Sequence, residues 1–291
     1  MPPIKKSLNA LNRMLDAYSV GEPIGYGARS VICEILPKDD REGEPLAAKC
    51  VAIKDERDRQ VLRHLENEYS VLKQLHDHHE NVDGIVDVVK LKKLRRFFRV
   101  KSACIIMERI EGQSLAENSD YTFKEKLTIV AHVCDILSQI HSLGWVHGDV
   151  KPDNIIVVGR ENDVKLIDFG FAAEIGTRLD SVKGTWGFLA PEQAGGKLQP
   201  VTDVFSLGGT MYWLLTGERL PSIVPGEEGE AGFVPQDGFS PIPPARIDPE
   251  IPLGLSDMIV DCCSTDLTRR PPLHQVRDAL RNLRLRKELG M

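Results

Sequence analysis

Short apolar runs dominate the first 110 residues, and they predict strands with a single long helix among them. Strands are expected at residues 18–24, around Lys49, and at 84–91 and 102–107, with a basic turn at 92–96 joining the last two. Leucines and valines recur at helical spacing between 55 and 75 and predict the helix. A similar spacing of Leu8, Leu11 and Leu15 predicts a short leading helix over 8–17.

Longer helical patterns take over in the second part of the chain. Thr122 and Glu125 form a capping box that opens an amphipathic helix to about Ser142, which ends before Gly144. Further helices are expected at 204–215, 255–263 and 273–285. Two short apolar strands, 155–158 and 164–167, flank a polar turn. The stretch 221–252 is rich in proline, glycine and acid, so we expect a surface insertion there.

Composition places the chain among ordinary globular proteins, with 42% hydrophobic and 27% charged residues. The net charge of −6 argues against nucleic-acid binding, because phosphate backbones select basic surfaces. The six cysteines lack metal-ligand spacing and are interpreted as reduced packing residues of a cytoplasmic protein. No stretch is long enough to span a bilayer, so no membrane segment is expected within this chain. The basic run at 92–96 is interpreted as solvated and is assigned no partner.

Candidate chemistry concentrates in one loop and the strand pair that follows it. Asp149, Lys151 and Asn154 stand at fixed offsets just before the strand at 155–158, and Asp168 follows the strand at 164–167. A hairpin of these strands would bring the four side chains close together. A carboxylate that orients a hydroxyl, an amine that neutralises phosphate, and oxygen ligands for Mg²⁺ suit phosphoryl transfer.

The joint pattern resembles that of eukaryotic-type protein kinases over nearly the whole chain. Its three parts are His147-Gly-Asp149-Val-Lys151-Pro-Asp-Asn154, Asp168-Phe-Gly170 and Ala190-Pro-Glu192. The resemblance implies an α+β, two-lobed protein-kinase fold. Its N-lobe, residues 18–110, would hold a small antiparallel sheet with one main helix, and its mostly helical C-lobe would span 111–291. Residues 1–17 would lead in.

The same resemblance implies roles for the loop residues. Asp149 would be the catalytic base, Lys151 would stabilise the γ-phosphoryl group, and Asn154 and Asp168 would bind Mg²⁺. Lysine at position 151 is typical of serine/threonine kinases. The implied supporting residues are His147 and Phe169 packed beneath the loop, Thr185 bonding near Asp149 and Lys151, Glu192 paired with Arg270, and Asp203 bonded to the loop backbone.

The N-lobe residues implied to bind ATP begin with Gly25 and Gly27, which would cover the phosphates, although Ser30 replaces the family's third glycine. Ile24 and Val31 would flank the adenine, and Met107 would be the gatekeeper beside it. Backbone groups of Glu108 and Ile110 would bond the base in the connection between lobes. Ala47 and Ile156 complete the implied nucleotide-binding set.

Two lysines compete for the phosphate-binding position. Lys49 and Lys54 both follow Ala-x, and we favour Lys49 because apolar residues follow it, whereas Lys54 opens a charged run. Lys49 would pair with Glu68, whose surroundings resemble the family's helix pattern. Glu66 is the competitor, but it lies about 200° around the helix from Glu68.

One departure from the family concerns regulation. The family's His-Arg-Asp is His147-Gly148-Asp149 here, and the missing arginine normally binds a phosphorylated activation-loop residue. We therefore expect activity that does not depend strongly on phosphorylation of Ser181 or Thr177, the two candidate positions.

The expected function is transfer of the ATP γ-phosphate to a serine or threonine hydroxyl of a protein. His-Gly-Asp also occurs in aminoglycoside-type phosphotransferases, which makes a small-molecule kinase an alternative. A pseudokinase scaffold is a third possibility, although Lys49, Asp149 and Asp168 are all retained.

Overall fold

The computed structural model describes residues 2–27, 29–39, 44–77, 82–96, 98–159, 162–179, 182, 184–194, 197–221 and 239–288. The chain forms two compact units, one of residues 1–80 with 86–110 and the other of residues 81–85 with 111–291. The first is built on an antiparallel sheet and the second is mostly helical, which confirms the α+β class. Ser181 and most of the expected insertion, residues 222–238, lie outside the described residues.

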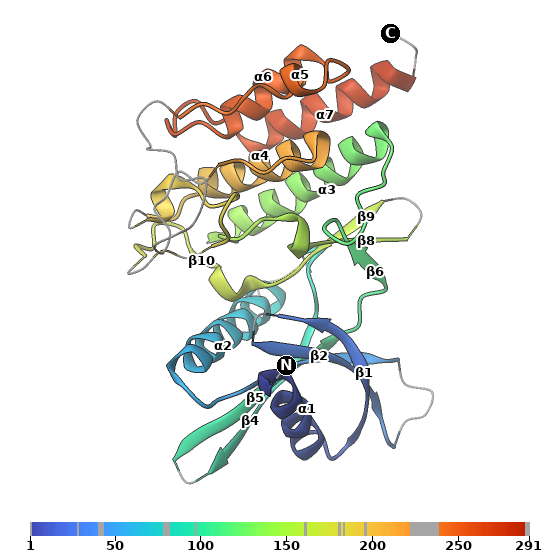
Figure 1. Ribbon diagram of the computed structural model, residues 1–291, viewed down its shortest axis with the longest axis vertical. Coiled ribbons are helices and arrows are strands. Elements are labelled where there is room, and N and C mark those ends of the chain that lie inside the picture. Colours follow the sequence, from blue (N-terminus) through green and yellow to red (C-terminus); the bar gives the residue numbers. More distant parts are fainter. Residues whose placement is uncertain are drawn as a thin grey trace. The chain divides into compact units, whose positions relative to one another are not determined.

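The first unit contains a five-stranded antiparallel sheet in the order β1-β2-β3-β5-β4 (Figure 1). Pro23 lies in the edge strand β1, at a register shift, where a missing N–H does not interrupt a central ladder. The strands are β1 (Tyr18–Tyr26), β2 (Ser30–Pro37), β3 (Leu46–Ala52), β4 (Val88–Arg96) and β5 (Arg99–Glu108).

The two faces of this sheet are covered by different helices. Leu11 and Leu15, in and just after α1 (Pro2–Met14), pack against one face, where Ala48 and Cys50 of β3 lie. Lys49 lies between those two residues in sequence and therefore points to the opposite face, toward α2 (Glu56–Asp77). Because successive side chains of β3 alternate, one face of the strand packs in the core against α1 and the other carries Lys49.

Two sequence expectations about this unit were wrong. The leading helix begins at Pro2 rather than at Leu8 and ends at Met14. Residues 92–96 form no turn; they continue β4 and pair with β5 as far as Arg96 opposite Arg99. Consecutive basic residues hide the alternation that marks a strand, so the sequence pattern resembles that of a turn.

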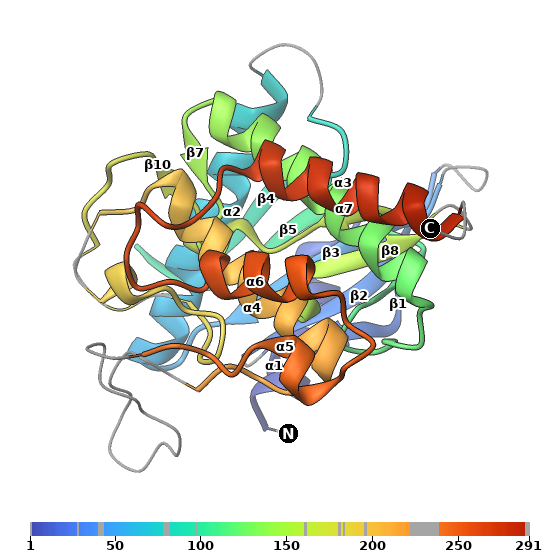
Figure 2. The same ribbon diagram turned by 90° about the horizontal axis from the view of Figure 1, so that it is seen from above.

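The second unit is organised around α3 (Phe123–Ser142), against which α7 (Leu273–Glu288) packs along its length (Figure 2). The capping box at the start of α3 is confirmed, since Thr122 and Glu125 bond reciprocally. The other helices are α4 (Pro200–Thr216), α5 (Pro244–Ile247) and α6 (Leu253–Cys262), and the strands are β6 (Gly112–Ser114), β7 (Trp145–Val146), β8 (Ile155–Val158), β9 (Asp163–Leu166) and β10 (Ala173–Glu174).

All six cysteines are buried and reduced. Burial raises the pKa of the Cys104 thiol to about 11 and that of Cys262 to about 12. These thiols act as small apolar packing groups, as the sequence predicts. Within the described residues no helix combines the length and apolarity needed to cross a membrane, and no group of His, Cys, Asp and Glu forms a ready metal cluster.

Candidate active site

One buried carboxylate, that of Asp203, holds the backbone of the loop that carries the predicted catalytic residues. Asp203, in the first turn of α4, accepts hydrogen bonds from the backbone N–H groups of His147 (2.9 Å) and Gly148 (2.8 Å). His141 Nε2 lies 2.8 Å from the Asp203 Oδ2 atom. The predicted bond between Asp203 and the loop backbone is therefore confirmed. Burial alone would raise the pKa of Asp203, but the hydrogen bond from His141, the charges of His141 and His147, and the Gly148 N–H hold it below its usual value.

Asp149 contacts both of the other predicted loop residues, Lys151 and Asn154, and is almost fully buried. Its Oδ2 atom lies 3.0 Å from Lys151 Nζ and accepts a hydrogen bond from Asn154 Nδ2 at 3.2 Å. Lys151 Nζ also donates to Thr185 Oγ1 at 2.7 Å, which confirms that Thr185 bonds beside this pair. The Oδ1 atom of Asp149 has no hydrogen-bond partner within the part of the chain that the structure describes. A buried carboxylate oxygen of this kind is available to a ligand.

Asp168 follows β9 in a left-handed backbone conformation, with φ 64° and ψ 69°. Such a conformation is uncommon for a residue other than glycine, and strain of this kind concentrates at functional sites. The next residue, Phe169, is fully buried and packs edge-on against His147, with ring centroids 4.7 Å apart. His147 Nε2 lies 3.1 Å from the Ile167 carbonyl oxygen. The predicted packing of His147 and Phe169 is confirmed, and it links the loop to the segment that carries Asp168.

In the first unit, Lys49 Nζ forms an ion pair with Glu68 Oε2 at 2.7 Å. Glu68 is almost fully buried on α2. The competing residues have other roles: Glu66 pairs with Lys93, and Lys54 lies after the end of β3, where its backbone N–H donates to Asp58. The predicted ion pair between Lys49 and Glu68 is confirmed.

Two of the predicted nucleotide-binding residues of this unit, Ala47 and Met107, lie on the Lys49 face of the sheet. Ala47 is two residues from Lys49 on β3 and pairs with Met107 of β5, so both share its face. Glu108 ends β5 and Ile110 follows it. Ile24, Gly25 and Gly27 lie at the end of β1 or just after it, and Ile156 lies in β8 of the second unit.

Val31 is a correction. It pairs with Cys50, is fully buried, and packs in the core beneath α1, on the face opposite Lys49. The neighbouring Ile32 pairs with Lys49 and is the β2 side chain on the Lys49 face. Both faces of β2 are apolar at this point, so the sequence did not reveal the phase of the strand.

Sequence reasoning missed Arg29, which lies in the glycine-rich turn. Its Nε atom donates to Asp58 Oδ1 (2.6 Å) and its Nη2 atom to Asp55 Oδ2 (2.7 Å), at the start of α2. Asp55 and Asp58 also cap this helix reciprocally through their backbone N–H groups. Arg29 therefore ties the glycine-rich turn to the helix that carries Glu68. The capping pattern Asp-x-x-Asp was the available signal.

A second missed residue is Gln193, next to Ala190-Pro191-Glu192. Its side chain is fully buried, donates from Nε2 to the Gly148 carbonyl oxygen (2.8 Å) and accepts from the Ala190 N–H (2.9 Å). Both polar groups of the Gly148 backbone are thus held by side chains, Asp203 on the N–H and Gln193 on the C=O. Gly148 has φ +77°, which favours glycine, and an added Cβ would lie 3.0 Å from the Phe171 carbonyl oxygen.

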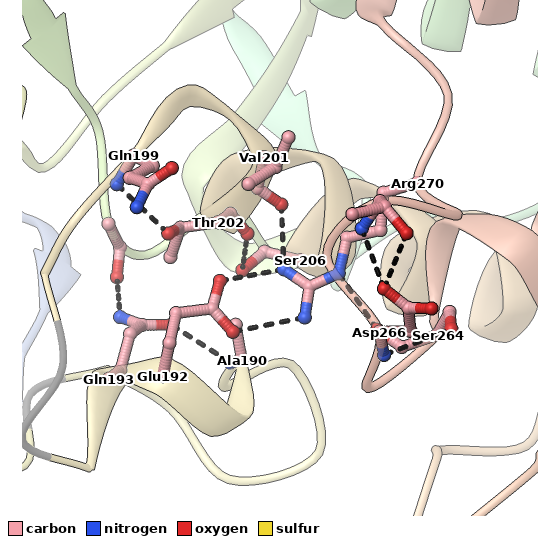
Figure 3. Close-up of polar contacts among 12 residues, drawn as sticks. Ala190, Glu192, Gln193, Gln199, Val201, Thr202, Ser206, Ser264, Asp266 and Arg270 are labelled. Carbon is pink, nitrogen blue, oxygen red and sulfur yellow. Dashed lines mark hydrogen bonds and ion pairs between the residues drawn. The ribbon is translucent and has the colours of Figure 1, made fainter.

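The same segment is anchored by the predicted pair of Glu192 and Arg270, which is confirmed (Figure 3). Arg270 Nη1 and Nη2 donate to the two Glu192 carboxylate oxygens at 2.6 and 3.0 Å. The guanidinium also donates to the carbonyl oxygens of Val201 (2.9 Å) and Ser264 (2.8 Å) and lies over the Phe205 ring. The Arg270 side chain is fully buried.

Comparison with known proteins places these clusters in a family context. A sequence profile of the protein kinase domain matches residues 18–279. The chain is 26% identical to a probable serine/threonine-protein kinase PknB of Lactococcus lactis, over 88% of this chain and 40% of that protein. It is 30% identical to the serine/threonine-protein kinase PknB of Mycolicibacterium smegmatis, over 79% and 37% of the two chains. It is 31% identical to human calcium/calmodulin-dependent protein kinase type 1B, over 69% and 57%. The chain spans less than two thirds of the length of each of these relatives.

Proposed function

Because the chain belongs to the protein kinase domain family, we propose that it is a serine/threonine protein kinase, which transfers the γ-phosphate of ATP to a hydroxyl group of a protein. The observation that carries this proposal is the state of the Asp149 carboxylate. One oxygen is fixed by Lys151 and Asn154, and the other is buried without a partner among the described residues. The hydroxyl group of a substrate can donate a hydrogen bond to this Oδ1 atom.

In this proposal Asp149 Oδ1 accepts the hydrogen bond of the substrate hydroxyl and orients it toward the phosphorus atom. Lys151 balances the negative charge that spreads over the transferring group, and Thr185 holds the lysine through its 2.7 Å hydrogen bond. The reaction requires little covalent chemistry from the protein, so positions and charges account for most of the catalysis.

Asn154 and Asp168 are proposed as the Mg²⁺ ligands, and the donor set fits the ion. Asn154 uses its Nδ2 group to hold Asp149, which leaves its Oδ1 oxygen facing away from that bond. A carboxamide oxygen and a carboxylate are hard ligands of the type that Mg²⁺ prefers. When bound, Mg²⁺ neutralises charge on the ATP phosphates.

The first unit would bind ATP. Lys49, held by Glu68, would contact the phosphates, while Gly25 and Gly27 supply a turn whose backbone can approach them. The apolar side chains of this unit proposed to line the adenine are Ile24, Ile32, Ala47 and Met107, and the backbone of Glu108 and Ile110 would bond the base.

We further propose that activity does not depend on a phosphorylated activation loop. Gly148 has no side chain that could bind a phosphate. Its backbone N–H and C=O groups are already hydrogen-bonded to Asp203 and Gln193. Activity equal to wild type in a Ser181→Ala, Thr177→Ala variant would support this. An inactive unphosphorylated wild type that gains activity on phosphorylation of Ser181 would contradict it.

The test of the kinase proposal is transfer of radiolabelled phosphate from Mg-ATP to a generic protein acceptor. We expect labelled serine or threonine with wild type and almost none with Asp149→Asn or Lys49→Met. Lys54→Met is the matched control and should retain activity, because that lysine lies after the end of β3. ATP binding without transfer to any protein would instead favour a scaffold or a small-molecule acceptor.

A further inference from the structure

The hairpin of β4 and β5 extends beyond the rest of its sheet. Strand β3 pairs with β5 only as far as Ala52 opposite Ser102. After one more backbone hydrogen bond, from the Ile53 N–H to the Lys101 carbonyl oxygen (2.8 Å), β4 and β5 continue alone as a two-stranded ribbon until Arg96 lies opposite Arg99. A two-stranded ribbon has little core to stabilise it, so its side chains are not selected by packing.

The ribbon carries a concentration of positive charge that contrasts with the acidic chain. Between Asp87 and Glu108 the sequence has seven lysines and arginines and no carboxylate. At the base of the ribbon, Lys92 and Lys93 have acidic neighbours in Asp16 and Glu66. The basic residues toward the tip are Arg95, Arg96, Arg99 and Lys101. Their side chains are exposed, and none of the four forms an ion pair with another described residue.

Two features of the tip are unfavourable for the folded protein alone. Arg96 and Arg99 are directly opposite each other across the ladder, and like charges in that arrangement destabilise a hairpin. Beside them, Phe98 is 97% exposed, more than any other large apolar side chain that the structure describes. Unpaired like charges around an exposed aromatic ring are explained if this tip meets a partner that is both anionic and apolar.

We propose that the tip of the β4–β5 hairpin binds the surface of an anionic lipid bilayer. The arginines would contact lipid phosphates, and Phe98 would enter the boundary between headgroups and acyl chains, where aromatic side chains are favoured. The contact is peripheral and requires no membrane-spanning helix. A hairpin tip with an exposed apolar group at its end suits insertion into a fluid surface.

Duplex nucleic acid is another large anionic partner, and it fits less well. It would use the arginines but would not require an apolar ring to leave water, and the net charge of −6 opposes an extended basic interface. An acidic protein would need a concave pocket to cover Phe98. The role of the ring therefore distinguishes a bilayer from both.

The proposal is tested by flotation of the full chain with phosphatidylcholine vesicles, with and without phosphatidylglycerol. We expect binding only to the anionic vesicles, weakened by salt. The Arg96→Gln, Arg99→Gln variant should lose about tenfold or more in partition, as expected for two charges near an anionic surface. Phe98→Ser should lose about tenfold through the lost apolar contact. Arg57→Gln, Lys73→Gln removes two exposed charges from α2 and should stay within about twofold of wild type.

A second readout follows insertion directly. In a Phe98→Trp variant, the emission of the new tryptophan should shift to shorter wavelength with anionic vesicles only. Failure of wild type to bind anionic vesicles at low salt would overturn the proposal. So would binding that is unchanged in both hairpin variants. Stronger binding to duplex DNA or polyglutamate, unaffected by Phe98→Ser, would reassign the surface to those partners.

Discussion

The pair of Glu192 and Arg270 should be among the most sensitive points for the stability of the second unit. Replacing Arg270 by Met removes a side chain that is fully buried and donates to four oxygen atoms. The remaining Glu192 carboxylate is only 12% exposed and would lose its counter-ion. Leaving one charge of a buried pair without its partner destabilises a protein by about 3–5 kcal/mol. We expect Arg270→Met to lower the free energy of unfolding by that amount.

The two partners should also be coupled. Glu192→Gln keeps a hydrogen-bond acceptor for the guanidinium and should destabilise by about 2–3 kcal/mol. In the double variant no charge is left unpaired, so its loss should be smaller than the sum of the single losses by about 2 kcal/mol. Arg269→Met is the control, because the neighbouring arginine is 59% exposed and its pair with Asp261 should contribute about 1 kcal/mol or less.

Urea unfolding followed by tryptophan fluorescence suits this experiment. The three tryptophans, Trp145, Trp186 and Trp213, all lie in the unit that contains the pair. The fluorescence transition therefore reports on that unit. The reasoning is refuted if the free energy of unfolding of Arg270→Met lies within about 1 kcal/mol of the wild-type value. It is also refuted if the losses of the two single variants add in the double variant.

Three other predictions concern the loop and α1. Gln193→Leu removes the bond to the Gly148 carbonyl and should lower kcat in the phosphate-transfer assay about tenfold or more with little change in KM for ATP, whereas Gln193→Glu, which keeps an acceptor for Ala190, separates the two contacts. Leu11→Ala, on the buried side of α1, should lower the free energy of unfolding by about 2–5 kcal/mol in urea titrations followed by circular dichroism; an unchanged midpoint would mean that α1 does not contribute to the core. The folded-state pKa of Asp203 is lowered, so its stabilisation is present above the unfolded pKa of about 4 and is lost as pH falls through the folded value; Asp203→Asn should flatten that acid limb of a stability–pH profile.

The sequence located the residues of the candidate site better than the contacts that hold them in place. Asp149, Lys151 and Asn154 stand within six positions of one another, so their proximity needed no long-range information. The choice of Lys49 over Lys54 rested on the residues that follow each lysine, because a lysine in a buried strand has apolar neighbours. Patterns of this kind involve residues that are close together in the sequence, so they can be recognised without knowledge of the fold.

Contacts between distant segments could not be predicted in the same way. Gln193 meets Gly148 from 45 positions away, and Arg29 reaches Asp58 across 29 positions. The Asp55-x-x-Asp58 capping pattern marks the start of α2 but does not indicate that Arg29 binds there, and no local pattern marks Gln193. The assignment of Val31 failed for a different reason: in a strand that is apolar on both faces, a shift of one residue exchanges the faces without changing the composition.

The burial of all six thiols has a practical consequence for labelling. In the native state the buried sulfur atoms, with their raised pKa values, should react very slowly with maleimides or disulfide reagents, since the thiolate is the reactive form. Unfolding of either unit exposes that unit's own three thiols, at positions 33, 50 and 104 in the first and at 134, 262 and 263 in the second. Mass spectrometry of pulse-labelled thiols could therefore tell which unit opens first. A cysteine introduced on the surface could be labelled selectively without removing any native one.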